Sequence, residues 1–310
     1  MATASGTLKT SDIVAHGLRG RRTDVGGLVF QALLLLALLI SLAFLVTLLA
    51  DIVRTGWSVL ADRGWDFVSS PVSSIAERAG VRQGIVGSML LMAFVVAIAF
   101  PIGIGSAVYL EEYAPNTRLT RFITVNIRNL AGVPSIVYGL LGLAIFVKLL
   151  VGYTGGRSVI SGGITIAILV LPIVIITSSE ALRAVPYAIR EAGYGVGATR
   201  WEVIRSHVLP AAAPGILTGT VLSLSRALGE TAPLLLVGAT TGFLATGGQS
   251  LYLQLYSNFT SLPTLVFSWS RNPSAGFRSA TAAAIIVLLL LTLTANAAAI
   301  ILRNRYDRKW

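Results

Sequence analysis

The sequence contains no cysteine, only two histidines and only three lysines. Without cysteine the chain can form no disulfide, no thiolate nucleophile and no zinc site with cysteine ligands. The histidines, His16 and His207, lie in different segments, which argues against a metal site because metals need a cluster of ligands. The phosphate-binding loop of ATPases places a lysine after a glycine, whereas the lysines here follow Leu8, Val147 and Arg308. We therefore expect no catalytic residue, no metal, no cofactor and no ATP hydrolysis by that route.

Charge is scarce as well, since charged residues make up 12% of the chain, hydrophobic residues make up 55% and the mean hydropathy is +0.79. Soluble domains carry about 25% charged residues, so these values predict an all-α integral membrane protein. Six apolar runs are long enough to cross a bilayer and predict six transmembrane helices. The runs are Leu28–Ala50, Ile85–Leu110, Leu130–Val147, Val159–Ser179, Ala211–Ala239 and Ala280–Leu302. Pro101, Pro134 and Pro172 lie within or at the ends of these runs, and we expect kinks there.

The charge that remains is mostly positive, with a formal net charge of +11. The basic residues are spread over separate juxtamembrane segments with no folded basic domain, which argues against a nucleic-acid partner. Lys and Arg favour the cytoplasmic side of a membrane, and fifteen of them fall on the side of the N-terminus against eight on the other. We therefore expect both termini in the cytoplasm, with an arm at 1–27, a six-helix transmembrane domain at 28–302 and a tail at 303–310.

Two segments on the opposite side contain aromatic residues. Trp57, Trp65 and Phe67 follow the first run and suit the aromatic belt at a membrane surface. The outer segment at about 240–279 is long for a bare loop, and Pro263 divides it. We expect two short helices there, lying on the outer face or dipping into it.

Arg226 and Glu230 are the only charged residues in the fifth run and lie one helical turn apart. In a helix that begins near Pro214, Arg226 lies about 12 residues in, which is ~18 Å along a hydrocarbon core of ~30 Å. An unpaired arginine there costs about 3 kcal/mol or more, so such residues usually face a bundle interior or a water-filled path. We interpret the pair, together with Ser223 and Thr231, as lining a pathway for an anion. The alternative is that Glu230 only neutralises Arg226 and the pair locks helix packing.

The segment at about 180–210 is the largest connection on the cytoplasmic side. Pro186 can begin one helix, and Thr199 with Glu202 forms the capping-box pattern of a second. Glycine lets backbones approach closely, so a bend is expected where the glycines interrupt the pattern. These glycines are Gly193, Gly195 and Gly197. Such a helix pair can sit in a groove on a separate protein.

This segment resembles the EAA loop of ABC importer permeases, which docks the ATPase subunit. The resemblance departs from the usual pattern at Gly193, where alanine is common, and at His207, where isoleucine is common. It implies the type I ABC importer permease (MetI-like) fold and assigns coupling to the ATPase to eight residues. They are Glu191, Ala192, Gly193, Gly197, Thr199, Arg200, Leu209 and Pro210.

Three further stretches resemble the permeases of bacterial phosphate importers, and the last resembles PstA-type permeases more than PstC-type ones. The stretches are Ala107–Pro115, Asn126–Gly139 and Ser225–Leu235. Arg226 and Glu230 fall on the charged intramembrane positions of that family. The resemblance implies a non-catalytic permease subunit in the bacterial cytoplasmic membrane that forms half of the phosphate pathway. The implied partners are inorganic phosphate, membrane lipid, a PstC-like permease, two copies of a PstB-like ATP-binding subunit and an extracytoplasmic PstS-like phosphate-binding protein.

Physical reasoning from the residues alone identifies the substrate only as an anion. One alternative is therefore a permease for another oxyanion. A second is a self-contained carrier in which Glu230 titrates and couples proton movement to transport. Inverted repeats with paired broken helices would favour that carrier, and the sequence shows no internal repeat. A third is a membrane scaffold in which all charges are structural.

Overall fold

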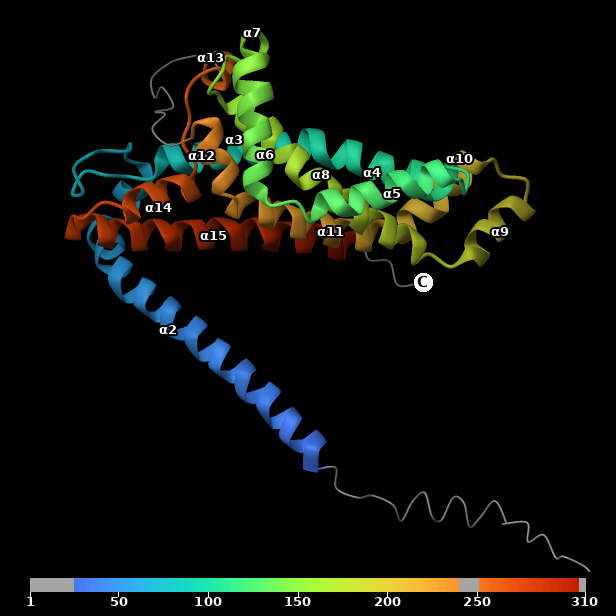
Figure 1. The fold of residues 1–310 in the computed structure, drawn as a ribbon, viewed down its shortest axis with the longest axis horizontal. Helices are drawn as coiled ribbons and strands as arrows, with labels where there is room; N and C mark the ends of the chain where they lie inside the picture. Colours follow the sequence, from blue (N-terminus) through green and yellow to red (C-terminus); the bar gives the residue numbers. More distant parts are fainter. Residues whose placement is uncertain (1–24, 240–250, 307–310) are drawn as a thin grey trace, which may run out of the picture. The chain divides into compact units, whose positions relative to one another are not determined.

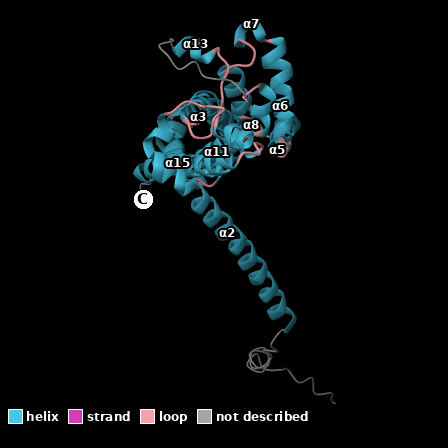
Figure 2. Cartoon of the chain, turned by 90° about the vertical axis from the view of Figure 1, so that its left-hand side faces the viewer, coloured by secondary structure: helices cyan, strands magenta, loops and turns pink. Residues whose placement is uncertain are grey.

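The computed structural model describes residues 25–239 and 251–306, and within these ranges it contains only helices and loops (Figures 1 and 2). The chain divides into two compact units, one up to Asp51 and one from Ile52 onward. The arm predicted at 1–27 lies outside the described residues except for Val25 and the two glycines after it, which already belong to the first helix.

The first unit is the apolar beginning of helix α2 (Val25–Ser69), which contains the predicted span Leu28–Ala50. The second unit starts within α2 and continues with one long helix in four parts. These parts are α3 (Arg82–Phe94), the π-helical turn η1 (Val95–Ala99), α4 (Phe100–Val108) and the π-helical turn η2 (Tyr109–Tyr113). The next helices are α5 (Arg118–Ala131), α6 (Ser135–Gly142), η3 (Leu143–Leu149) and α7 (Val151–Thr154).

The second half of the chain contains the central helix and the loop singled out in the sequence. Its elements are α8 (Val159–Arg183), α9 (Tyr187–Gly195), α10 (Arg200–Val203), η4 (Ile204–Val208), α11 (Leu209–Gly229), α12 (Ala232–Val237), α13 (Leu251–Leu255), α14 (Leu262–Ser270) and α15 (Ala275–Tyr306). Since α10, η4 and α11 follow one another without a break, Arg200–Gly229 forms one helix.

Five of the described helices are long and apolar enough to cross a membrane, and a sixth crossing results if α5 and the helix that follows it form one bent span. The predicted all-α membrane architecture is thereby confirmed, and the predicted six spans correspond to the count that includes the bent pair. The five are Val25–Ser69, Arg82–Tyr113, Val159–Arg183, Arg200–Gly229 and Ala275–Ile301.

Helix α8 lies at the centre of the second unit, with α3, α4, α5, α6 and α11 packed around it (Figure 1). Ala167, Leu169 and Val170, which point to different sides of α8, are at most 3% exposed, which is typical of a helix that is apolar on every side. Close packing on α11 uses small residues, because Gly215 faces Ala181 and Gly219 faces Thr177 of α8. α8 is therefore the scaffold against which the functional elements are positioned.

The outer segments differ in part from the prediction. Helix α2 is kinked at Gly64, where φ is 37°, and the part after the kink, up to Ser69, carries Phe67. Phe67 lies in the core, where it is 0% exposed and its ring lies 6.4 Å from that of Trp269. The aromatic-belt interpretation is therefore wrong for Phe67, whereas Trp57 and Trp65 are exposed. The two short helices predicted at 240–279 are present as α13 and α14, and residues 240–250 lie outside the described part.

The predicted third span, Leu130–Val147, is wrong at its start. The chain turns by 99° between α5 and α6, at Gly132–Pro134, so that Leu130 belongs to α5 and the next helix begins at Ser135. Proline disfavours helical backbone in the residue before it, which accounts for the break at this point. Both views show α6 standing across the direction of α8 and α11 (Figures 1 and 2).

The predicted fifth span, Ala211–Ala239, is two helices instead of one. α11 ends at Gly229 and α12 begins at Ala232, with Glu230 in extended conformation between them. Pro233 has no N–H to donate to the carbonyl of Gly229 four residues earlier, and its ring would clash with that carbonyl in a continuous helix. The apolar run therefore contains a helix break where the charged pair is located.

Candidate substrate pathway and coupling surface

The predicted ion pair is present at the break between α11 and α12. Nε of Arg226, in the last turn of α11, donates to Oε1 of Glu230 at 3.2 Å. The Arg226 side chain is 45% exposed and the Glu230 side chain 13% exposed. A cation in the last turn of a helix also interacts favourably with the helix dipole.

The neighbouring helices show where this break lies along the bundle. Gly215 faces Ala181 and Gly219 faces Thr177, so α8 and α11 run in opposite directions. In the same register, Arg226, seven residues after Gly219, lies opposite residue 170, seven residues before Thr177. Residue 170 is in the middle of α8. In addition, the Ser225 hydroxyl bonds Asn296, which lies inside the apolar run of α15. Arg226 therefore lies opposite the middle of α8, at the point where its own helix ends, and its depth in the membrane stays a prediction.

The bend between α5 and α6 meets the same point. A Cβ on Gly139 of α6 would lie only 2.6 Å from the Cα of Pro233, so α6 and α12 are in backbone contact. The Tyr138 hydroxyl of α6 donates to the Leu130 carbonyl of α5 at 2.8 Å, so this bond spans the bend between the two helices. Two broken helices thus meet opposite the middle of α8, and broken helices are elements from which membrane transporters build substrate sites.

The four residues predicted to line the pathway do not share one surface. Ser223 is 0% exposed and its hydroxyl donates to the Gly219 carbonyl, so it belongs to the packed side of α11. Thr231 is half-buried beside Glu230, and only Arg226 is well exposed. The structure therefore joins Arg226 to Glu230, leaves Thr231 as the next residue along the chain, and places Ser223 in the packing of α11.

The predicted helix pair in the segment at 180–210 is present as α9 and α10. Pro186 precedes α9, and Thr199 and Glu202 form the predicted capping box at the start of α10. The bend falls at Val196–Ala198, because α9 continues through Gly193 to Gly195. Gly197 has φ +83°, which L side chains rarely adopt, and open space around it.

The eight predicted coupling residues divide into an exposed and a packed group. Glu191, Ala192, Gly197, Thr199, Arg200 and Pro210 are exposed, whereas Gly193 is buried and Leu209 is half-buried. A Cβ on Gly193 would lie 2.7 Å from Val203, so this glycine allows α9 to pack on α10. The tight packing within the chain therefore occurs at Gly193, and close contact of Gly197 with a partner stays a prediction.

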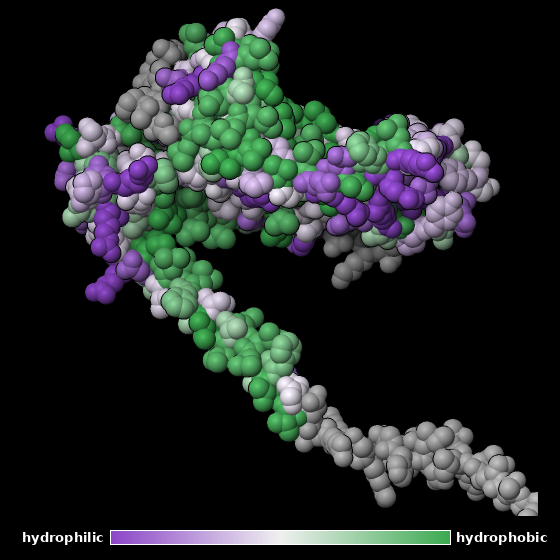
Figure 3. All heavy atoms as spheres, viewed as in Figure 1, coloured by the Kyte–Doolittle hydropathy of each residue, from purple (hydrophilic) through white to green (hydrophobic). Residues whose placement is uncertain are grey.

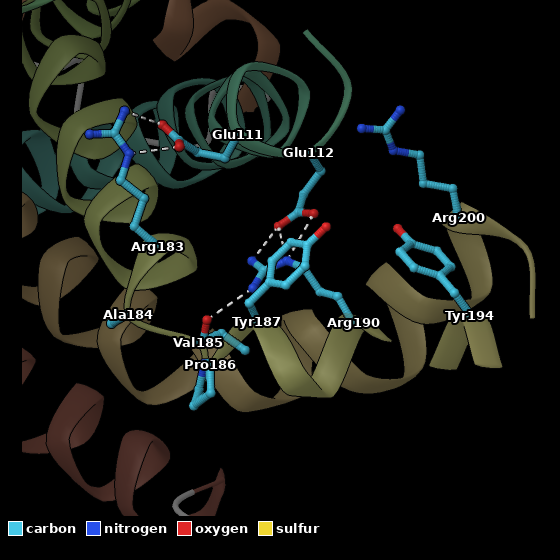
Figure 4. Close-up of a pocket in the computed structure, with 10 residues that line it drawn as sticks. All are labelled: Glu111, Glu112, Arg183, Ala184, Val185, Pro186, Tyr187, Arg190, Tyr194 and Arg200. Atoms are coloured by element: carbon cyan, nitrogen blue, oxygen red, sulfur yellow. Dashed lines mark hydrogen bonds and ion pairs between the residues drawn. The ribbon is translucent and has the colours of Figure 1, made fainter. Parts of the chain in front are cut away.

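Sequence reasoning gave no role to three consecutive residues at the end of η2. Each of these residues, Glu111, Glu112 and Tyr113, contacts one arginine, and Figure 4 shows the two ion pairs. The pairs are Glu111 with Arg183 at 2.7 Å, Glu112 with Arg190 at 2.6 Å, and the Tyr113 ring with the Arg200 guanidinium at 5.0 Å. The sequence did contain a signal for these pairs. Two adjacent carboxylates stand at the end of an apolar run, and arginines stand in another segment predicted on the same side of the membrane.

A pocket of about 730 Å³ lies between η2 and α9. Its lining includes the two ion pairs together with Tyr187 and Tyr194. Hydrophilic side chains gather at this end of the second unit, where α5, α9 and α10 lie, whereas hydrophobic ones cover α6 (Figure 3). The segment at 180–210 therefore has a polar pocket beside α9.

Comparison with known proteins gives this architecture a family. A family model described as "Binding-protein-dependent transport system inner membrane component" matches residues 99–308. The chain belongs to this family. The matched range covers both the segment with α9 and α10 and the break at Arg226 and Glu230.

Two relatives and one solved structure illustrate the membership in this permease family. The probable ABC transporter permease protein YqgI of Bacillus subtilis (strain 168) is 35% identical over 64% of this chain and 66% of its own length. The phosphate transport system permease protein PstA 1 of Mycobacterium tuberculosis (strain ATCC 25618 / H37Rv) is 35% identical over 77% of this chain and 75% of its own length. The chain thus spans about two thirds of the first relative and three quarters of the second.

The solved structure is that of a bacterial ABC transporter involved in the import of the acidic polysaccharide alginate. It matches with a TM-score of 0.64 at 15% identity, over 90% of this chain and 96% of that one. At this identity the likeness concerns the fold alone, and it confirms the predicted ABC importer permease fold.

Proposed function

We propose that this chain is the permease subunit of an ATP-driven importer of inorganic phosphate and forms half of its translocation pathway. The observation that carries the proposal is the paired, partly exposed guanidinium of Arg226 where two broken helices meet. A relative that is 35% identical over most of the chain is named as a phosphate transport system permease, which supports phosphate as the substrate.

The chemistry of Arg226 suits an oxyanion. Its planar guanidinium has five N–H donors, and within the described part of the chain only Nε is engaged, by Glu230. The remaining donors can meet phosphate oxygens in the bidentate geometry that arginine favours. Glu230 fixes the guanidinium and reduces its net attraction for the anion, so that a bound phosphate can leave again.

In this proposal, ATP hydrolysis by the partner is coupled to transport through the continuous helix Arg200–Gly229. This helix starts in the coupling loop and ends beside Arg226, roughly 39 Å away at 1.5 Å per residue. A partner that shifts α9 and α10 therefore moves the break at mid-depth as part of a rigid body. The chain itself performs no catalysis in this scheme, and the energy comes from the ATPase.

The proposed complex contains a homologous PstC-like permease, two copies of a PstB-like ATP-binding subunit and an extracytoplasmic PstS-like phosphate-binding protein. A relative named as the phosphate transport system permease PstC is 30% identical to this chain, which supports pairing between two related permeases. The proposed location is the bacterial cytoplasmic membrane, with both termini and the loop at 180–210 in the cytoplasm.

A proton-coupled anion carrier is the second candidate, because broken helices that meet at mid-depth are also a feature of such carriers. The test is reconstitution of the complete complex in proteoliposomes, with phosphate, arsenate or sulfate supplied together with the binding protein. ATP-dependent phosphate uptake is expected. Uptake that follows a proton gradient in the absence of ATP would support the carrier, and ATP-dependent uptake of only another oxyanion would replace phosphate as the substrate.

A further inference from the structure

The ion pair between Glu112 and Arg190 connects two parts of the chain that are far apart in sequence. Glu112 lies on η2 at the end of the long helix Arg82–Tyr113, and Arg190 lies on α9. The side chains are only 5% and 12% exposed, and Nη2 of Arg190 lies 2.6 Å from the carboxylate. In such surroundings the pair is weakly screened by solvent and its geometry is fixed.

The guanidinium of Arg190 also binds two backbone carbonyls. Nη1 donates to the Val185 carbonyl at 2.9 Å (Figure 4), and Nη2 donates to the Leu182 carbonyl at 3.0 Å. One side chain of α9 is therefore attached to η2, to the end of α8 and to the turn between α8 and α9. A lysine in its place presents a single compact ammonium and lacks the planar fork that reaches all three.

The helix Arg82–Tyr113 is not continuous with the coupling loop, because α8 precedes the loop and the helix Arg200–Gly229 follows it. Movement of α9 reaches this third helix only through side-chain contacts. Arg200 of α10 adds a second contact at the same place, since its guanidinium lies 5.0 Å from the ring centre of Tyr113. The end of η2 is thus attached to both helices of the loop.

We propose that Glu112 and Arg190 are positioning residues that fix α9 to the helix Arg82–Tyr113. The movement that the ATPase imposes on the loop then shifts this helix together with the helix that leads to Arg226. The inference rests on the proposed ATP-driven transport, and it adds a second route by which the loop acts on the membrane-spanning part.

The first test compares Glu112→Gln with Glu111→Gln in the complete complex in proteoliposomes. In Glu112→Gln we expect the ATP hydrolysed per phosphate imported to rise about tenfold, a usual size for coupling between sites, with normal ATPase co-purification. Glu111 pairs with Arg183, whose side chain is 50% exposed at the end of α8, so this matched variant does not touch α9 and should stay at the wild-type ratio. An unchanged ratio in Glu112→Gln would overturn the proposal.

The second test does not depend on phosphate. The chain has no cysteine, so spin labels can be placed at Gly105→Cys in α4, where an added Cβ meets open space, and at Ala188→Cys on the exposed part of α9. With Glu112 intact, the distance between the labels should be the same with and without ATP and vanadate. In Glu112→Gln it should change with nucleotide, because α9 then moves alone.

The two tests distinguish failure of the proposed phosphate transport from failure of the positioning role of Glu112 and Arg190. A complex that imports no phosphate overturns the proposed substrate, and the label distances still decide the role of the ion pair. A distance that changes with nucleotide when Glu112 is intact, or stays constant in Glu112→Gln, overturns the positioning role. If Glu112→Gln does not assemble, Arg190→Lys keeps the charge but loses the threefold contact and should give the same change in distance.

Discussion

Arg226 is the residue at which the proposed function can be tested most directly. Lysine keeps the positive charge but offers one compact ammonium, which cannot hold Glu230 and an oxyanion in the same planar arrangement. We expect Arg226→Lys to reduce ATP-dependent phosphate uptake per assembled complex by about tenfold or more, equivalent to about 1.4 kcal/mol. Arg278→Lys, at an exposed arginine near the start of α15, is the matched control. Equal uptake in both variants would make Arg226 a structural residue.

Glu230 should affect the release of substrate more than its capture. The substitution Glu230→Gln keeps the size of the side chain but removes the carboxylate that pairs with Arg226. The unpaired guanidinium should then hold phosphate more tightly, so we expect a lower apparent KM together with a lower maximal rate. Uptake kinetics in proteoliposomes measure both quantities, and assembly must be checked because a charge left without its partner destabilises a bundle. A raised KM would contradict this role.

The sequence identified the charged pair but not its surroundings. Two charges in an apolar run are visible in any reading, and their spacing of four residues predicted the contact that the structure contains. The burial of Ser223 was not visible, because a polar stripe on a helix looks the same whether its hydroxyl faces a pathway or bonds the preceding turn, as here. The residues at the end of η2 were missed because each of their partners lies about 70 or more residues away in the sequence.

The contact between α6 and α12 joins the two broken helices that carry the site. Because Gly139 faces the backbone of Pro233 and not a flexible side chain, a methyl group there cannot be accommodated by a rotamer change. We expect Gly139→Ala to destabilise the solubilised complex by about 1–3 kcal/mol, the usual cost of overpacking. Gly105→Ala in α4, where the added Cβ meets open space, should be neutral or slightly stabilising. Thermal unfolding of both variants measures the difference, and equal midpoints would exclude the tight contact.

The bend between α9 and α10 depends on backbone conformation at Gly197. Its φ of +83° is strained for a β-branched residue, whereas asparagine adopts positive φ more readily. We expect Gly197→Val to lose ATPase co-purification and Gly197→Asn to retain most of it. Loss in both variants would mean instead that a partner packs directly against this position, which is the role predicted from the sequence.

Helix breaks were the elements that hydropathy could not predict. An apolar run records how well residues tolerate lipid, and it says nothing about whether the backbone inside it is continuous. The signal was nevertheless present, because Pro233 follows Gly229 at the spacing where proline removes the helical hydrogen bond and clashes with the carbonyl. At Pro101 and Pro210 the helix continues. In both places a π-helical turn ends two residues before the proline, at Ala99 and at Val208. Such turns relax the local hydrogen-bonding pattern, so proline alone does not predict a break.

At the scale of the molecule, the membrane architecture and the two-helix loop were predictable, because long apolar runs and capping signals act locally. The position of the helix break along the bundle was not predictable, because it depends on how α8 and α11 are aligned against each other. That alignment places a 45% exposed arginine on a surface opposite the middle of α8. A guanidinium facing hydrocarbon is costly, so this surface must be covered by protein or open to a water-filled path in the working complex.

Leu222 provides the test of this last step. It is 64% exposed and lies one helical turn before Arg226, on the same face of α11. A spin label at Leu222→Cys in the cysteine-free chain should be accessible to oxygen dissolved in the lipid when the chain is reconstituted alone. In the complex with the homologous permease, we expect that accessibility to fall several-fold, because the partner closes the pathway around Arg226. If the label remains as accessible to oxygen in the complex as in the isolated chain, this face meets lipid, and Arg226 does not line a pathway between two permeases.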